Sequence, residues 1–327
     1  MKTKILLYDV AAEYGGALSV LKLFYQNAVE DIENEYIFVT SIVDLKEREN
    51  IKTIKLPWVK KSWLHRLYCD WIYMPKLVKE KRVSKLISLQ NIGIRSCGVY
   101  QAVYVHNAIP FSEYRFSLFW DSKLWLYQNL ISHLMKESLR NVDEIIVQTT
   151  WMKNAVATKY GINEKKIFVQ AVTVEVEGDK ERVDVDKTIF FYPAQPFKFK
   201  NHQIIIDACK LLKEDGYEVI LTLDEMEKRN SKLISQIRKY QLPIKCVGYL
   251  DKRRMYEYYK KSILVFPSYL ETIGLPLLEA KEFDAEIIAA DCNYSRNALE
   301  GYSKVSYFEY NDSHKLADLM MDKVGKE

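Results

Sequence analysis

The chain has 327 residues, which is long enough for two ordinary α/β domains, and 48% hydrophobic with 28% charged residues is the balance of a globular protein. The formal net charge of +4 is small for this length and argues against a dedicated nucleic-acid-binding protein. The five cysteines are odd in number, scattered and never arranged as C-x-x-C, so they indicate neither a zinc site nor a disulfide framework.

The sequence also bears on location. No run approaches the roughly 18 consecutive apolar residues of a membrane span, and the amino terminus lacks a signal-peptide cleavage pattern. We therefore expect a cytoplasmic protein with reduced thiols.

The chain opens with a strand and a glycine-bearing turn. Residues 4–8 form an apolar run that ends at Asp9, and Gly15 and Gly16 then precede an amphipathic helical pattern. Paired glycines at a helix start either let a diphosphate approach the backbone or serve only the tight turn. The residues alone favour neither interpretation.

Residues 52–82 change in character, because tryptophans alternate there with lysines. Aromatic bodies with basic rims suit the interface of a bilayer, which would make this stretch a peripheral contact with the inner membrane surface. The helical spacing of Trp63, Leu67 and Trp71 is equally typical of an amphipathic helix whose aromatics fill the domain core. Single-stranded nucleic acid is disfavoured by the modest global charge.

The rest of the first half alternates strands and helices. Residues 36–40, 83–89, 100–106 and 143–148 are predicted strands, and residues 124–139 and 152–160 are predicted helices. The strand at 100–106 delivers His106 to a loop, and Gly161 ends the second helix. The charged, glycine-bearing residues 175–187 are predicted to link an amino-terminal domain, residues 1–174, to a carboxy-terminal domain, residues 188–327.

The second domain begins with a strand at 188–191 and a basic loop. Lys198 and Lys200 stand just ahead of a helix at 203–212. A positive side chain added to the amides and dipole of a helix start fits a pyrophosphate leaving group, whereas the alternative is a solvated basic loop. Further strands are predicted at 218–223 and 244–249, and further helices at 231–240, 255–259 and 313–323.

Residues 262–291 read as a βαβ unit. An apolar run at 262–266 precedes a loop, Pro276 presets the first turn of a short helix, and residues 287–290 return as a buried strand. This order places the loop 269–275 at the carboxyl edge of a parallel sheet, where ligands bind.

Two acids flank that helix start. Glu271 lies before the turn and Glu279 within the helix, and Gly274 stands between them. Free N–H groups at the helix start bind anions and carboxylates accept from hydroxyls, so phosphate plus polyol is the ligand that this arrangement suits. In the alternative interpretation, Glu271 is a solvated loop acid and Glu279 a surface residue.

The stretch from Pro267-Ser268 through Glu271-Thr272-Ile273-Gly274-Leu275-Pro276 to Glu279-Ala280 resembles the E-x7-E signature of retaining GT-B glycosyltransferases. The group concerned is family four, glycosyl transferases group 1 of the bacterial polysaccharide type. The resemblance implies an α/β fold of two Rossmann-like domains facing each other across a cleft, with the acceptor on the first and the nucleotide sugar on the second. Thr272 departs from the pattern, because glycine is common at its position.

The resemblance also implies roles for single residues. Glu271 would bind hydroxyls of the donor sugar, Lys200 the diphosphate and His106 the donor sugar, and these three are the catalytic candidates. The substrate-binding candidates are Gly15 and Gly16 at the donor phosphates, Thr272, Ile273, Gly274 and Leu275 at the sugar and diphosphate, Glu279 at the ribose, and Val247, Gly248 and Tyr249 at the base. Gln195 stands where many members have Arg, so one positive contact is missing or is supplied by Lys198.

The expected function is transfer of a hexose-type sugar from a nucleotide sugar to a glycan or lipid-linked acceptor. By resemblance it proceeds with retention of configuration, without a metal or other cofactor, in the synthesis of a bacterial surface polysaccharide. Two alternatives stay open. One is a catalytically silent partner that binds a nucleotide sugar or a membrane surface, which Gln195 and Thr272 favour; the other is a GT-B nucleotide-sugar epimerase, whose acid and base residues are not evident in the sequence.

Overall fold

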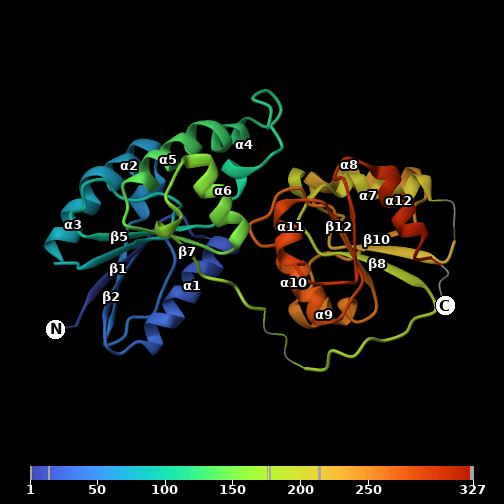
Figure 1. The fold of residues 1–327 in the computed structure, drawn as a ribbon, viewed down its shortest axis with the longest axis horizontal. Helices are drawn as coiled ribbons and strands as arrows, with labels where there is room; N and C mark the ends of the chain where they lie inside the picture. Colours follow the sequence, from blue (N-terminus) through green and yellow to red (C-terminus); the bar gives the residue numbers. More distant parts are fainter. Residues whose placement is uncertain (1, 14, 175, 177, 213–214, 325–327) are drawn as a thin grey trace. The chain divides into compact units, whose positions relative to one another are not determined.

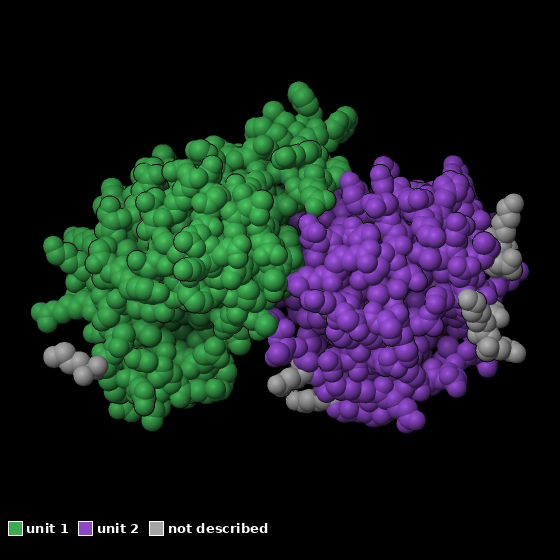
Figure 2. Space-filling view, viewed as in Figure 1, with its two compact units in different colours: residues 1–171 green, residues 172–327 purple. Residues whose placement is uncertain are grey.

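The structure, a computed structural model, describes residues 2–13, 15–174, 176, 178–212 and 215–324. The chain forms two compact units, Met1–Ala171 and Val172–Glu327 (Figure 2). Each is an α/β unit built on its own parallel sheet, and each is described by itself. Residues 175 and 177 of the predicted linker lie outside the described residues.

The first unit contains a seven-stranded sheet in the order β3-β2-β1-β4-β5-β6-β7, in which every neighbouring pair is parallel. Its strands are β1 (Lys4–Asp9), β2 (Glu35–Thr40), β3 (Ile51–Lys55), β4 (Lys85–Ser88), β5 (Tyr100–Val105), β6 (Glu144–Val147) and β7 (Ile167–Val169). The strand order reverses between β1 and β4, which is the topological switch point of a doubly wound sheet.

Helices cover both faces of this sheet (Figure 1). They are α1 (Gly15–Glu30), α2 (Trp63–Tyr68), α3 (Met74–Glu80), α4 (Ser122–Leu126), α5 (Ser132–Arg140) and α6 (Thr150–Tyr160). A π-helical turn, η2 (Cys69–Tyr73), joins α2 to α3, and another, η4 (Tyr127–Ile131), joins α4 to α5. Short 3-10 turns are η1 (Pro57–Lys60), η3 (Ile109–Phe111) and η5 (Glu164–Lys166).

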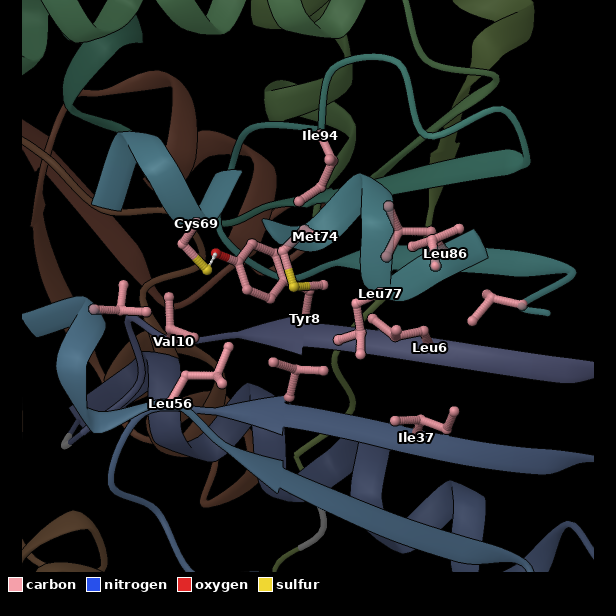
Figure 3. Packing of buried hydrophobic residues seen from close by; sticks show 14 residues of the cluster. Leu6, Tyr8, Val10, Ile37, Leu56, Cys69, Met74, Leu77, Leu86 and Ile94 are labelled. Carbon is pink, nitrogen blue, oxygen red and sulfur yellow. Dashed lines mark hydrogen bonds between the residues drawn. The ribbon is translucent and has the colours of Figure 1, made fainter. Parts of the chain in front are cut away.

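The apolar residues of β1 alternate between two cores. Leu7 packs with α1 on one face, while Leu6 and Tyr8 pack with the helical run from α2 to α3 on the other. Figure 3 shows the phenol of Tyr8 directed at Cys69 Sγ. The two atoms lie 3.3 Å apart, and the phenol also donates to Asp70 Oδ1 at 2.6 Å. The core between β1 and the α2–α3 run therefore ends in the hydrogen-bonded pair of Tyr8 and Asp70, near the end of β1.

The aromatic stretch is divided between core and surface. Ile51–Lys55 forms the edge strand β3, which we did not predict. Trp58 packs against the core, but Trp63 and Trp71 are 67% and 51% exposed. The interpretation of this stretch as core packing is therefore right for Trp58 and wrong for Trp63 and Trp71.

The second unit repeats the architecture with six parallel strands in the order β10-β9-β8-β11-β12-β13. They are β8 (Thr188–Tyr192), β9 (Tyr217–Leu221), β10 (Ile244–Cys246), β11 (Ile263–Phe266), β12 (Ile287–Ala290) and β13 (Val305–Phe308). The predicted strand at 244–249 is too long, because its last residues leave the ladder and Gly248 adopts a φ of 69°.

Figure 1 shows α7, α8 and α12 on one face of this sheet and α9, α10 and α11 on the other. The helices are α7 (His202–Leu211), α8 (Ser231–Lys239), α9 (Lys252–Tyr259), α10 (Leu275–Glu282), α11 (Asn293–Ala298) and α12 (Ser313–Met321), with 3-10 turns η6 (Lys198–Lys200) and η7 (Lys228–Asn230). The β11–α10–β12 unit is as predicted, since β11 and β12 pair in parallel across α10. The expected fold class, two Rossmann-like domains, is confirmed.

The segment ahead of β8 is attached to the second unit. Arg182 Nη1 donates to the carbonyls of Tyr259 at 2.8 Å and Ser262 at 3.1 Å, and Val183 N donates to Lys260 O at 3.0 Å. Asp179 pairs with Lys260 at 2.5 Å. Residues 179–183 are thus held by the end of α9.

None of the helices in the described part of the chain is both long and apolar enough to cross a bilayer.

Candidate functional site

The switch point of the second sheet brings two loops together. Because β8 and β11 are neighbours whose connections leave in opposite directions, the loops that follow them meet at the carboxyl edge. The first loop ends in η6 with Lys200, and the second contains Glu271. The backbone joins them directly, since Tyr269 N donates to Phe199 O at 3.0 Å.

Lys200 and Glu271 form an ion pair between Nζ and Oε1. Their side chains are only 18% and 14% exposed, so water screens the pair less than a surface pair. Ser268 Oγ also lies 2.8 Å from Glu271 Oε1 and donates to it. The structure therefore unites the acid and the base that the sequence placed 71 positions apart.

Buried hydroxyls fix both loops from behind. Tyr192, the last residue of β8, donates to Lys200 O at 2.7 Å, and Tyr294 donates to Ser268 O. Asn201 takes a left-handed conformation with φ 58° and donates to Tyr310 O at 2.7 Å. The position of the ion pair is set by groups that the sequence analysis did not single out.

The start of α10 depends on Gly274. Its φ is 78°, and a Cβ built there would lie 3.1 Å from Leu277 and 3.2 Å from the ring of Tyr294. Only glycine fits both the backbone angle and the space. The turn therefore directs the first amides of α10 out of the helix beside Glu271.

Glu279 is partly buried one turn further along α10. Tyr259 donates its phenolic proton to Glu279 Oε2 at 2.9 Å. Burial raises the pKa of Glu279, and the hydrogen bond from Tyr259 opposes that rise. This phenol holds one carboxylate oxygen and leaves Oε1 to other partners.

The remaining candidates of the second unit lie at the same sheet edge but are more exposed. Gln195 and Lys198 are exposed in the loop after β8. Val247, Gly248 and Tyr249 follow β10, and the side chain of Tyr249 is 90% exposed. Thr272 and Ile273 are half-buried, and Leu275 begins α10.

Three candidates belong to the first unit. Gly15 starts α1 with φ 63°, and nothing lies within 4 Å of a Cβ built at Gly15 or Gly16. His106 follows β5, and its backbone N–H donates to Asn91 Oδ1 at 2.8 Å. Burial lowers the pKa of His106 to about 4, so its imidazole is neutral at pH 7.

One buried acid of the first unit was not predicted as a site. Asp9 ends β1 at the switch point, and its Oδ1 accepts from the N–H groups of Ala11 and Ala12 at 3.1 and 3.0 Å. Burial raises the pKa of Asp9 to about 6. An acid directly after an apolar strand was the sequence signal.

Within the described residues, no group of three or more His, Cys, Asp or Glu side chains is placed to hold a metal ion. Asp184-Val185-Asp186 has a D-x-D spacing, but both acids are exposed. They precede the amino-terminal end of β8, and so lie at the sheet edge opposite to Lys200 and Glu271.

Each unit is a doubly wound parallel sheet covered by helices, and together they match the fold of solved GT-B glycosyltransferases. Residues 173–323 match the family model described as "Glycosyl transferases group 1". That match covers the unit that contains the Lys200–Glu271 pair.

Solved structures agree on the fold. A glycosyltransferase from Rickettsia africae is 14% identical and has a TM-score of 0.68 over 98% of this chain and 88% of its own. Sucrose-phosphate synthase from Thermosynechococcus elongatus is 15% identical, also with a TM-score of 0.68, over 98% and 89%. HepE from Anabaena, solved in complex with UDP, is 13% identical with a TM-score of 0.67 over 98% and 89%. No curated protein sequence matches significantly.

Proposed function

We propose that this protein is a glycosyltransferase of the retaining, family four type, which transfers a hexose-type sugar from a nucleotide sugar to a glycan or lipid-linked acceptor. The observation that carries the proposal is the Lys200–Glu271 pair beside the start of α10. Support also comes from the family model over residues 173–323 and from the UDP bound by HepE.

The ion pair explains how a donor would be recognised. A diphosphate competes for Lys200 because its charge exceeds that of one carboxylate, and the amides at the start of α10 add donors for it. Glu271, released from Lys200 but still bonded to Ser268, then accepts from sugar hydroxyls. We assign Glu279 Oε1, the oxygen that Tyr259 does not engage, to the hydroxyls of the nucleotide ribose.

The chemical step needs no protein nucleophile in this proposal. The bond between the anomeric carbon and the phosphate oxygen breaks, and the acceptor oxygen bonds to the same face of that carbon. The departing phosphate takes the acceptor's proton. Lys200 stabilises the charge that develops on the leaving group, which is the principal contribution of the chain. We propose that no metal takes part. Because Gln195 carries no charge, Lys198 is the second cation that we propose for the diphosphate.

In the proposed reaction the first unit binds the acceptor and also adds contacts to the donor. Gly15 and Gly16 offer an open backbone at the start of α1 for the donor phosphates, and His106, neutral at pH 7, offers its backbone or ring to the donor sugar. We assign residues 1–174 to the acceptor and 188–327 to the donor, with Val247–Tyr249 at the base.

Turnover with a panel of labelled nucleotide sugars tests this function. Glu271→Ala and Lys200→Ala should each lower kcat/KM at least ~100-fold and leave the fold intact. Glu282→Gln is the matched control for acid removal, because Glu282 lies on α10 but pairs with Lys180. Near-normal turnover by either alanine variant would refute the assigned roles, and an inverted anomeric product would refute retention.

We further propose that the protein works in the cytoplasm and contacts the inner membrane surface through residues 52–82, in the synthesis of a bacterial surface polysaccharide. Five free thiols and the exposed Trp63 and Trp71 support this location. Trp63→Ser should weaken sedimentation with vesicles containing anionic lipid, whereas equal sedimentation of wild type and variant would exclude Trp63 from the contact.

The second candidate is a catalytically silent nucleotide-sugar-binding partner, favoured by Gln195 in place of a cation. In the same panel, saturable binding without transfer or hydrolysis would favour that candidate. Epimerised donor would instead identify an epimerase.

A further inference from the structure

The first unit contains a pocket of about 560 Å³ that takes no part in the proposed sugar transfer. Three of its lining residues, Leu67, Asp70 and Trp71, belong to the stretch 52–82 proposed above as a membrane contact. Its walls come from the α2–η2 helical run, from the loop between β4 and β5 and from α5. Figure 1 shows α2 and α5 on the same side of the first sheet. The volume is in the range of small-molecule sites.

The pocket lies away from the carboxyl edge of the sheet. Gln101, at the start of β5, and Asp143, just before β6, both line it. It therefore sits towards the amino-terminal ends of these strands, whereas Asp9, Gly15 and His106 lie at the opposite ends. This position separates it from the proposed donor and acceptor contacts.

Apolar side chains form much of the wall. Ile94 is part of the buried core that Figure 3 shows, and Leu67 also lines the pocket. Trp71 and Leu134 also line the pocket but are 51% and 44% exposed. The apolar lining thus runs from the core to solvent, as a site for a hydrocarbon chain requires.

The lining contains three acids and one arginine, Arg95, and two of the acids pair with arginines outside the lining. Asp70 pairs with Arg66 at 2.8 Å, and Glu137 pairs with Arg140 at 3.7 Å. Asp143 accepts from the backbone N–H of Gln101 at 2.8 Å.

Arg95 has no such partner: its guanidinium lies 5.2 Å from the ring centroid of Trp71, and it forms no ion pair with any residue that the structure describes. A guanidinium this close to an aromatic face is attracted to it by a cation–π interaction, and its fork of N–H donors matches the geometry of a phosphate. Ser96, which follows Arg95 in the chain, also lines the pocket and carries a hydroxyl that can donate a hydrogen bond.

We propose that this pocket binds a single-chain lipid phosphate, with the phosphate on Arg95 and the chain between Trp71 and Leu134. The site is independent of the proposed sugar transfer. Because Trp71 and Leu134 line the pocket and are partly exposed, a chain that enters between them keeps contact with apolar side chains.

Binding of decyl phosphate below its micellar concentration, followed by calorimetry, tests the proposal with the intact protein and no nucleotide sugar. We expect saturable binding with one ligand per chain, and at least tenfold weaker binding of inorganic phosphate and of decanol. Arg95→Gln should weaken decyl phosphate about tenfold and leave decanol unchanged. Because no sugar transfer is measured, failure here leaves the proposed enzyme activity unaffected.

Leu134→Trp should fill the pocket and weaken decyl phosphate at least tenfold. Leu130→Trp is the matched control, because Leu130 is 54% exposed, lies four positions earlier in the same helical run and does not line the pocket. Melting temperatures identify any variant that fails to fold. Absence of saturable binding to wild type, equal losses in the two tryptophan variants, or equal losses of decanol and decyl phosphate in Arg95→Gln would each overturn the proposal.

Discussion

Replacement of Gly274 by alanine tests the geometry at the start of α10. At φ 78° an L-residue costs about 1–2 kcal/mol, of which the reduced freedom of the unfolded chain returns up to about 1 kcal/mol. The new methyl group would also lie 3.2 Å from the ring of Tyr294, which hydrogen-bonds the Ser268 carbonyl and has little room to move. Such overpacking costs about 1–3 kcal/mol. Gly274→Ala should therefore lower the free energy of unfolding by about 2–4 kcal/mol.

Gly248→Ala is the control for the backbone part of that loss. Gly248 belongs to the same unit and has φ 69°, but nothing lies within 4 Å of a Cβ built there. Its replacement should cost only about 1 kcal/mol. Urea unfolding followed by circular dichroism measures both. Equal losses of unfolding free energy in the two variants would show that the ring of Tyr294 moves aside at no cost. That result would refute the crowding that we assign to this turn.

Three further changes probe buried polar groups. Tyr259→Phe removes the hydrogen bond to Glu279, so the KM for the donor should rise about tenfold with kcat nearly unchanged. Because that bond lowers the pKa of Glu279, the pH below which donor binding fails should also move upwards. Unchanged kinetics would contradict this role of Tyr259. Asp9→Asn should raise stability by about 1–2 kcal/mol at pH 8 and by much less at pH 4. The folded pKa of about 6 exceeds the unfolded 3.8, so the fold loses stability as the pH rises from 3.8 through about 6, and the substitution removes that loss. His202 has a folded pKa of about 4 against 6.5 when unfolded, so the fold loses stability as the pH falls through that window. His202→Gln should reduce that loss by about 2–3 kcal/mol in urea titrations at pH 7.5 and 4.5, and an unaltered loss would place its cause elsewhere.

The sequence predicted elements whose signals are local. Gly161 does end α6 with φ 63°, and the apolar runs on either side of Pro276 do form β11 and β12. Val305–Phe308 forms the edge strand β13 although its side chains are mostly half-buried, and we did not predict it. A strand that is only half-buried shows little of the apolar run that identifies a central strand.

Residue chemistry alone made Lys200, Glu271 and Glu279 candidates for binding phosphate and hydroxyls, and the resemblance gave each of them a specific role. Glu271 and Lys200 were candidates, but nothing in their neighbourhoods indicated that Tyr192 and Tyr294 fix their loops, since those contacts arise when strands distant in sequence align. The pocket that we propose for a lipid phosphate was not predicted either. Its wall combines three segments, none of which has a motif of its own.

The attachment of residues 179–183 affects how the second unit can be produced alone. A fragment that begins at Thr188 would remove the guanidinium of Arg182 from the carbonyls of Tyr259 and Ser262. Tyr259 is also the residue that orients Glu279, so the truncation would loosen a site that it does not touch. An excised second unit should therefore start upstream of Asp179, and, on the proposed function, proteolytic trimming to a later residue should weaken its affinity for nucleotide.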